Sequence, residues 1–139
     1  MCKGTDIKIM CDVVEEVLAK KCEKMGAHAL IAVNNNAGGH RGPLKPEVLI
    51  PLLRKHVNIP IVSAGGIGTW EGVKSIMNMG CGGLSIGSPF IAAEESAAWK
   101  EYKEACVEYG KDDVVTTTKI SGTPCTVLNT PYVKEVGTE

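Results

Sequence analysis

Four short apolar segments recur along the chain at intervals that suit a repeated unit of one strand and one helix. They begin at positions 7, 29, 59 and 83 and are therefore 22, 30 and 24 residues apart. Each runs at its carboxyl end into glycine, asparagine, serine or aspartate. This alternation is typical of an α/β fold with a parallel sheet. The strands predicted from these segments are Ile7–Asp12, Ala29–Asn34, Ile59–Ala64 and Gly83–Gly87.

A helix is expected after each predicted strand. Asp12 followed three places later by Glu15 predicts an N-terminal capping pair for the first helix, which should run to about Met25 and close at Gly26. The second is expected from Pro46 to Val57, the third from Thr69 to Gly80, and a long fourth from about Ile91 to Tyr109. Residues 114–139 are rich in threonine, proline and glycine and are expected to form an irregular tail of the same single domain, 1–139.

The length of the chain limits the choice among α/β folds. It has 139 residues, enough for one ordinary domain, whereas a complete (β/α)₈ barrel needs roughly 250. The chain is therefore either another α/β fold or part of a barrel.

Composition excludes several classes of partner. The formal net charge is -1, so no excess of positive charge favours nucleic acid or an anionic membrane. No apolar run approaches the roughly 18 residues of a membrane span. The six cysteines include no CxxC pair, and they are interpreted as structural thiols of a cytoplasmic protein rather than as a metal site.

Two glycine turns are the strongest functional signal. They lie in PIVSAGGIGTW, 60–70, and GLSIGSPF, 83–90, each directly after a predicted strand. Turns of this kind expose main-chain N–H groups to an anion such as phosphate, and a barrel uses such turns after its seventh and eighth strands. A dinucleotide fingerprint fits less well, because Glu71 occupies the place of the third glycine of GxGxxG. The alternative without function is that both are simple tight turns.

The segment AGGHRG, 37–42, presents a histidine from a loop at the end of the second predicted strand. Gly38 and Gly39 allow the backbone to approach a planar ligand closely, and His40 can donate a hydrogen bond or move a proton near neutral pH. The alternative is a loop histidine bonded only to neighbouring backbone. His28 and His56 are interpreted as structural.

Together, AGGHRG, the segment from 59 to 96 and TTKISGTPCTVLNTPYV resemble the C-terminal half of the nitronate monooxygenase family. These are FMN-dependent TIM-barrel flavoproteins, related to FMN-dependent enoyl-acyl-carrier-protein reductases. The resemblance covers nearly the whole chain. It implies a fold of four successive βα units forming the C-terminal half of a (β/α)₈ barrel, and an enzyme that oxidises alkyl nitronates with O₂ to a carbonyl compound and nitrite.

The resemblance also implies roles for individual residues. His40 would be the catalytic group beside the flavin, and Arg41 would help to bind the anionic substrate. The FMN site would comprise Gly38, Gly39, Ala64, Gly65, Gly66, Gly87 and Ser88.

Two departures from the family pattern keep more than one function open. Ser88 and Pro89 stand where many relatives have Thr-Arg, and Thr123 stands where relatives often have arginine. A branch of reductases that use NAD(P)H, of the enoyl or quinone type, therefore stays open, as does an inactive phosphate-binding half-barrel. The N-terminal strands of the family are absent, so the barrel is expected to be completed by self-association or by a separate N-terminal half.

Overall fold

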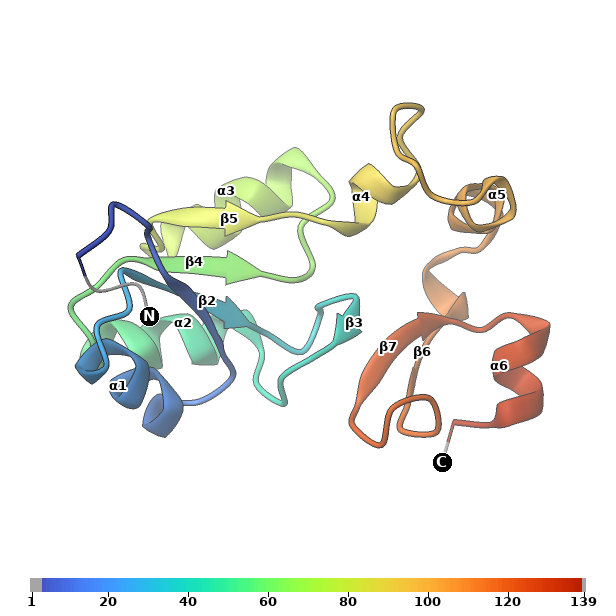
Figure 1. The fold of residues 1–139 in the computed structure, drawn as a ribbon. Coiled ribbons are helices and arrows are strands. Elements are labelled where there is room, and N and C mark those ends of the chain that lie inside the picture. Colours follow the sequence, from blue (N-terminus) through green and yellow to red (C-terminus); the bar gives the residue numbers. More distant parts are fainter. Residues whose placement is uncertain (1–3, 139) are drawn as a thin grey trace.

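A four-stranded parallel sheet forms one half of the molecule, on the left of Figure 1, in the computed structural model, which describes residues 4–138. Its strands are β1 (Met10–Val13), β2 (Ala29–Val33), β4 (Ile61–Ala64) and β5 (Gly83–Ser85). They lie side by side in the order β1-β2-β4-β5, and all three neighbouring pairs are parallel. The four predicted strands and their parallel arrangement are thus confirmed, with ends that differ by at most three residues.

Three helices cover one face of this sheet: α1 (Glu16–Lys24), α2 (Pro46–His56) and α3 (Trp70–Asn78). The core is formed where alternate strand residues such as Leu30 and Ala32 meet Leu49 and Leu53 of α2. In a second cluster, Ile50 and Ile76 pack with Cys81, which precedes β5, and with Leu84 of β5. The intervening strand residues, Ile31, Val33 and Val62 among them, point to the opposite face and stay partly exposed.

The helix ends test the predicted capping residues. Thr69 caps α3 as predicted, because its hydroxyl accepts a hydrogen bond from the N–H of Gly72 at 3.1 Å. Gly26 and Gly80 follow α1 and α3 with φ of 94° and 81°, a backbone conformation that favours glycine. The predicted cap at Asp12 is wrong: β1 extends through Val13, Glu15 is the N-cap of α1, and no side chain bonds there.

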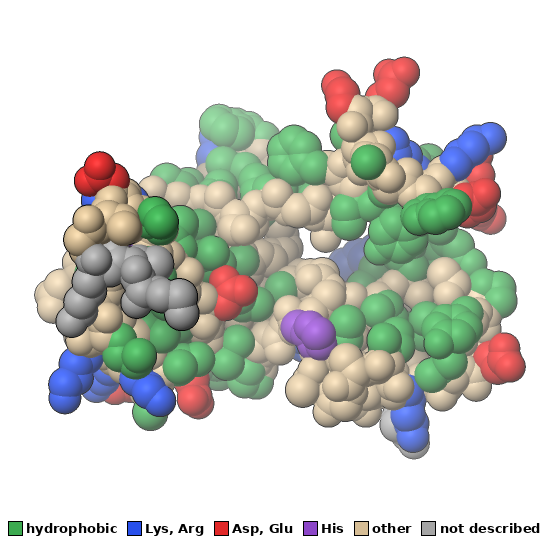
Figure 2. Space-filling model, in the orientation of Figure 1, with side chains coloured by type: hydrophobic (Ala, Val, Ile, Leu, Met, Phe, Trp, Pro, Cys, Tyr) green, Lys and Arg blue, Asp and Glu red, His purple; other side chains and the backbone are tan. Residues whose placement is uncertain are grey.

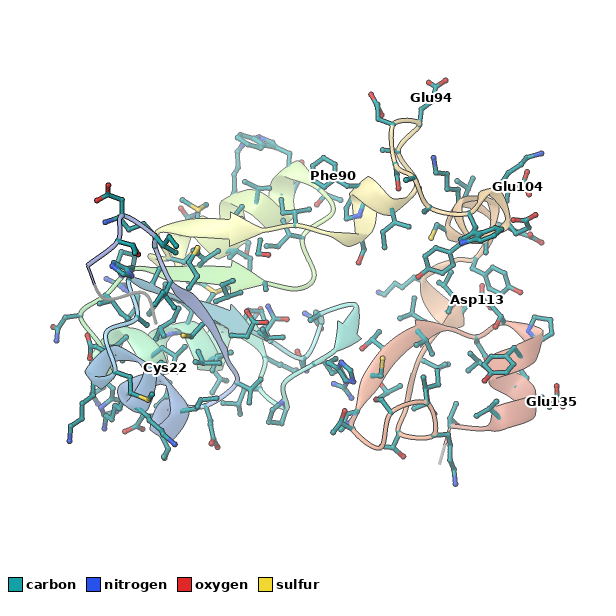
Figure 3. The ribbon with its side chains drawn as sticks, in the orientation of Figure 1. Cys22, Phe90, Glu94, Glu104, Asp113 and Glu135 are labelled. Carbon is teal, nitrogen blue, oxygen red and sulfur yellow. The ribbon has the colours of Figure 1, made fainter. Side chains whose placement is uncertain are left out.

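The long helix predicted from Ile91 to Tyr109 is confirmed only in its second half, because residues 92–99 are not helical. A single turn, α4 (Ser88–Ile91), is separated from α5 (Lys100–Glu108) by a segment that turns back on itself, with Glu94 at its tip (Figure 3). The hydroxyl of Ser96 accepts a hydrogen bond from the N–H of Ala98 at 3.1 Å, a local bond that competes with helix formation. Trp99, the residue before α5, is 84% exposed.

The tail is regular, contrary to the prediction. After a short 3₁₀ turn, η1 (Lys111–Asp113), it forms β6 (Val114–Thr117), β7 (Cys125–Leu128) and α6 (Pro131–Val136). β6 and β7 pair antiparallel, and β7 also pairs with β3 (Gly39–His40), which gives a second sheet in the order β3-β7-β6. The β-branched residues of VVTT and CTVL favour these strands. The tail therefore packs on the histidine loop that follows β2 (Figure 1).

Large apolar side chains are exposed on several helices, including Val17 of α1 and Trp70 of α3 as well as residues of α5 and α6. Figure 2 shows hydrophobic surface over the part of the molecule formed by α5, α6 and the second sheet. Val107 and Tyr132 are 79% and 65% exposed there. Among residues 4–138, no helix combines the length and the apolar character needed to cross a bilayer.

Candidate functional site

Three loops meet beyond the carboxyl ends of β2, β4 and β5. A Cβ atom added to Gly38 would lie 2.7 Å from the Oγ of Ser88, which places the loop after β2 against the turn after β5. A Cβ atom on Gly65 would lie 2.5 Å from the main-chain nitrogen of Ala37, and one on Gly66 would lie 2.8 Å from the Cβ of Asn36. The two predicted glycine turns and the AGGH loop therefore form one continuous surface at this edge of the sheet.

The turn after β4 has a backbone that only glycine adopts readily. Gly65 and Gly66 have φ of 110° and 73°, both in the region that L-residues with a side chain avoid. Within residues 4–138, the N–H groups of Gly65 and Gly66 donate no hydrogen bond. Two adjacent donors thus remain available where the strand ends.

The turn after β5 is similarly open. The N–H groups of Gly87 and Ser88 donate no hydrogen bond in the described part of the chain, while the carbonyl of Gly87 accepts one from Phe90 at 2.9 Å. No atom would lie within 4 Å of a Cβ added to Gly87. The two turns together present main-chain N–H donors and a serine hydroxyl, the kind of group that binds anions, and each turn contacts the loop after β2.

Asn34 joins the histidine loop to the first glycine turn. Its side chain is completely buried; the amide NH₂ donates to the carbonyl of Gly65 at 3.1 Å, and its oxygen accepts from the N–H of Asn36 at 2.8 Å. Its own N–H donates to the carbonyl of Ala64 at 3.1 Å. From the sequence, Asn34 is predicted only as the end of a strand. A polar residue directly after a buried apolar run is the local signal for a side chain that bonds neighbouring loops.

His40 is held by the second sheet. It forms β3 with Gly39 and pairs with Cys125 of β7, and its Nε2 lies 2.8 Å from the Oγ of Ser121 in the loop between β6 and β7. The residue is exposed. Sequence reasoning placed His40 in a free loop and missed Ser121, because no local pattern connects two residues 81 positions apart.

Arg41 points back toward the loop after β2. Its Nη1 donates to the carbonyl of Asn35 at 3.2 Å, and its buried Nε has no hydrogen-bond partner among the described residues. His40 and Arg41 line a cavity of about 170 Å³ together with Asp12, Val14, Leu18 and Val33. The cavity lies where β1 and β2 end, and its polar lining residues are His40, Arg41 and the acidic Asp12. A larger open hollow of about 380 Å³ lies on α5 and contains none of the predicted site residues.

The other two histidines make structural contacts. His28 accepts a hydrogen bond at Nδ1 from the N–H of Ile9 at 3.0 Å. The Nε2 of His56 lies 3.4 Å from the carboxylate of Glu16, which also binds Lys20. The hydrogen bond from Lys20 and the charge of His56 hold the pKa of Glu16 below its ordinary value, against a smaller opposing effect of burial. Both histidines therefore stabilise the scaffold, as the sequence predicts.

The cysteines in the described part of the chain are all reduced. Cys22 on α1, labelled in Figure 3, contacts Cys11 on β1. Burial and the hydrogen bond to Cys11 raise the pKa of the Cys22 thiol above its ordinary value. A thiol of this kind is a poor nucleophile at neutral pH.

The fold and the site together define a class: a parallel α/β chain in which two glycine turns and a histidine loop meet at the carboxyl edge of the sheet. The family model for nitronate monooxygenase matches residues 7–139, and the chain belongs to that family. Enzymes of this family, and the FabK and nitroalkane oxidase structures to which the chain is similar, are FMN-dependent TIM-barrel oxidoreductases.

Two curated relatives show how far the similarity extends. A probable nitronate monooxygenase of Staphylococcus saprophyticus is 33% identical, over 88% of this chain and 37% of its own length. The (3aS,4S,5R,7aS)-5-hydroxy-7a-methyl-1-oxo-octahydro-1H-indene-4-carboxyl-CoA dehydrogenase of Rhodococcus jostii is 33% identical, over 85% of this chain and 33% of its own length. The chain thus spans about a third of the length of the curated relatives it matches.

Two solved structures have the same fold over nearly the whole chain. FabK from Thermotoga maritima superposes with a TM-score of 0.89 and 34% identity, covering 96% of this chain and 43% of FabK. Nitroalkane oxidase from Streptomyces ansochromogenes gives a TM-score of 0.84 and 26% identity, covering 96% of this chain and 41% of the oxidase. The mixed α/β fold with its parallel sheet is therefore that of TIM-barrel family members.

Proposed function

We propose that the chain is the FMN-binding part of an oxidoreductase that oxidises alkyl nitronates with O₂ to a carbonyl compound and nitrite. The observation that carries the proposal is the contact between the loops that contain Gly38, Gly65, Gly66 and Ser88. Membership of the nitronate monooxygenase family supports both the cofactor and the class of reaction.

The residues present fit the phosphate of FMN. Gly65 and Gly66 on one side and Gly87 and Ser88 on the other have unbonded N–H groups, and the strand that ends at Ala64 brings the first pair to the edge of the sheet. A side chain on Gly66 would meet Asn36 and block the same space. Main-chain donors on two turns bind a dianionic phosphate without a paired cation.

His40 and Arg41 are proposed to act on the substrate. Bound FMN supplies the electron transfer, so the protein needs mainly to orient the substrate and balance its charge. His40 would donate a hydrogen bond to the anionic nitronate, or would take the α-proton if the neutral nitroalkane is the substrate. Gly38 and Gly39 would let the backbone approach the ring closely, and Arg41 would contribute positive charge at the cavity that it shares with His40.

We also propose that the four βα units form the C-terminal half of a (β/α)₈ barrel. β1 and β5 each have one neighbour in the parallel sheet. The face opposite the helices carries partly exposed apolar residues such as Ile31 and Val62. Such edges and faces are covered in closed barrels. A second copy of the chain or a separate N-terminal half would supply the cover, and the reduced cysteines favour a cytoplasmic setting.

The test compares two flavins that differ only in the phosphate. FMN and riboflavin are titrated into the chain while flavin fluorescence is followed, and FMN should bind at least about tenfold more tightly if the two turns grip its phosphate. Ethyl nitronate is then added in air, with and without an added N-terminal half of a relative, and nitrite is assayed. Equal affinity for both flavins would refute the phosphate site, and FMN binding without nitrite release by the completed barrel would refute the reaction.

The second candidate is a reductase that uses NAD(P)H. It is favoured by the similarity to FabK, which is an enoyl-acyl-carrier-protein reductase, and to a carboxyl-CoA dehydrogenase. Rapid anaerobic bleaching of the bound flavin by NAD(P)H would select this branch, and slow bleaching with rapid nitrite release would select the first. An inactive half-barrel would not bind FMN and would catalyse neither reaction.

A further inference from the structure

The loop between β6 and β7 is built to hold one hydroxyl against His40. Gly122 has φ of 77°, and its N–H donates to the carbonyl of Thr118 at 2.7 Å, which closes the loop on itself. The N–H of Lys119 donates to the hydroxyl of the buried Thr117 at 3.1 Å. The N–H of Arg41 donates to the carbonyl of Pro124 at 3.3 Å, so the two sides of the loop are tied both to β6 and to the residue after His40.

Ser121 lies at the tip of this loop with three polar atoms around its hydroxyl. Nε2 of His40 is at 2.8 Å, the carbonyl oxygen of Thr123 at 3.4 Å and the hydroxyl of Thr123 at 3.3 Å. The carbonyl oxygen can only accept a hydrogen bond. When the hydroxyl of Ser121 donates to it, the short contact with His40 is made by an Nε2–H group that donates to Ser121.

We propose that Ser121 is a positioning residue that keeps the proton of His40 on Nε2 and leaves Nδ1 as the proton acceptor; this rests on the proposed role of His40. In the oxidation of a neutral nitroalkane, the α-C–H bond would break, the proton would pass to Nδ1, and the electron pair would stay on the substrate as the nitronate. The resulting imidazolium keeps its Nε2–H bond to Ser121, so the ring need not turn during the transfer. A histidine with the opposite tautomer would offer a donor at Nδ1 and no base.

The tautomer can be read directly from ¹⁵N chemical shifts in the apo chain, because protonated and unprotonated imidazole nitrogens resonate far apart. The chain has three histidines, and His28 is an internal standard: its Nδ1 accepts from the N–H of Ile9, so its proton is on Nε2 when the ring is neutral. At alkaline pH we expect His40 to show the same pattern as His28. Ser121→Ala should shift both nitrogens of His40 toward the averaged values of exchanging tautomers, and Ser121→Thr should restore the pattern.

A His40 ring protonated on Nδ1, or a pattern that Ser121→Ala leaves unchanged, would overturn the proposal. The signals of His28 show whether each variant is folded; if Ser121→Ala does not fold, the wild-type pattern and the Ser121→Thr variant decide the question. FMN takes no part in this measurement. A chain that fails to bind FMN but shows the expected tautomer would refute the proposed function alone, and a chain that binds FMN with the wrong tautomer would refute the role of Ser121 alone.

Discussion

Replacing Asn34 with alanine tests whether the glycine turn after β4 is held in place by a buried side chain. The amide of Asn34 makes two hydrogen bonds, to the carbonyl of Gly65 and from the N–H of Asn36, at 3.1 and 2.8 Å. Each bond contributes about 1 kcal/mol net, and a polar group left unbonded in the interior costs about 1–3 kcal/mol. Because Asn36 is exposed, its N–H can bind water instead. Most of the penalty therefore comes from the carbonyl of Gly65, which loses its donor.

We therefore expect Asn34→Ala to lower the free energy of unfolding by roughly 2–3 kcal/mol, which corresponds to a fall in Tm of roughly 10 °C for a domain of this size. FMN should also bind more weakly, since Gly65 and Gly66 are then free to leave the positive-φ conformation that exposes their N–H groups. Stability is measured by urea and thermal unfolding with circular dichroism, and affinity by the flavin titration.

Asn78→Ala is the matched control. Asn78 is the last residue of α3, its side chain is exposed, and it makes no side-chain hydrogen bond in the described part of the chain. The same chemical change there should alter stability by less than about 0.5 kcal/mol. If Asn34→Ala behaves like Asn78→Ala, the amide does not hold the turn. If it destabilises the chain but leaves the FMN affinity intact, the turn keeps its shape without Asn34.

Three further variants or measurements probe the site and the scaffold. Gly66→Ala and Gly26→Ala both place a side chain at positive φ and should each cost about 1 kcal/mol of stability. Only Gly66→Ala, whose Cβ would lie 2.8 Å from a neighbouring side chain, should weaken FMN binding in the titration. Equal FMN affinities of the two variants would argue against the phosphate turn. His40→Ala should lower turnover at least about a hundredfold and leave FMN affinity unchanged, and nitrite release at the wild-type rate would exclude a catalytic role. Because the pKa of Cys22 is raised above its ordinary 9.0, iodoacetamide should alkylate it more slowly than a cysteine peptide at neutral pH, as measured by mass spectrometry. The same shift stabilises the fold below the ordinary thiol pKa, and this contribution should be lost as the pH rises through the raised value.

Local sequence signals predicted the elements whose cause is itself local. Gly26 and Gly80 end helices because the chain there takes a positive φ, and Thr69 caps α3 through a bond to a residue three places away. Short apolar runs predict the parallel strands, because such strands carry apolar side chains on both faces. Since the strands are parallel, their carboxyl ends lie at the same edge of the sheet. The glycine turns of the candidate site could be identified in the same way.

Elements fixed by distant contacts could not be predicted. β3 consists of two residues that pair with the distant β7, and no local pattern marks it. β6 and β7 pair with each other across a short loop, but the threonine, proline and glycine around them hide their β-branched signal. The apolar spacing from Trp99 onward resembles a helix face, and α5 forms there, yet Trp99 itself stays exposed. The helix does not extend further toward the N-terminus, where Ser96 accepts a local hydrogen bond from Ala98. Ser121 carries no signal of its own, because its role depends on a loop closed by Gly122.

The site divides into two parts with separate supports. The proposed phosphate donors lie at the ends of β4 and β5 and depend on the parallel sheet and on Asn34, whereas the orientation of His40 depends on β7 and Ser121 in the second sheet. The AGGH loop contributes to both parts, since a Cβ atom on Gly38 would meet Ser88 while Gly39 and His40 pair with β7. We therefore expect a substitution in the tail to misplace the imidazole without disturbing the proposed phosphate turns, and a substitution in a glycine turn to do the reverse. That separation is why affinity for FMN and the state of His40 serve as independent measurements in this chain.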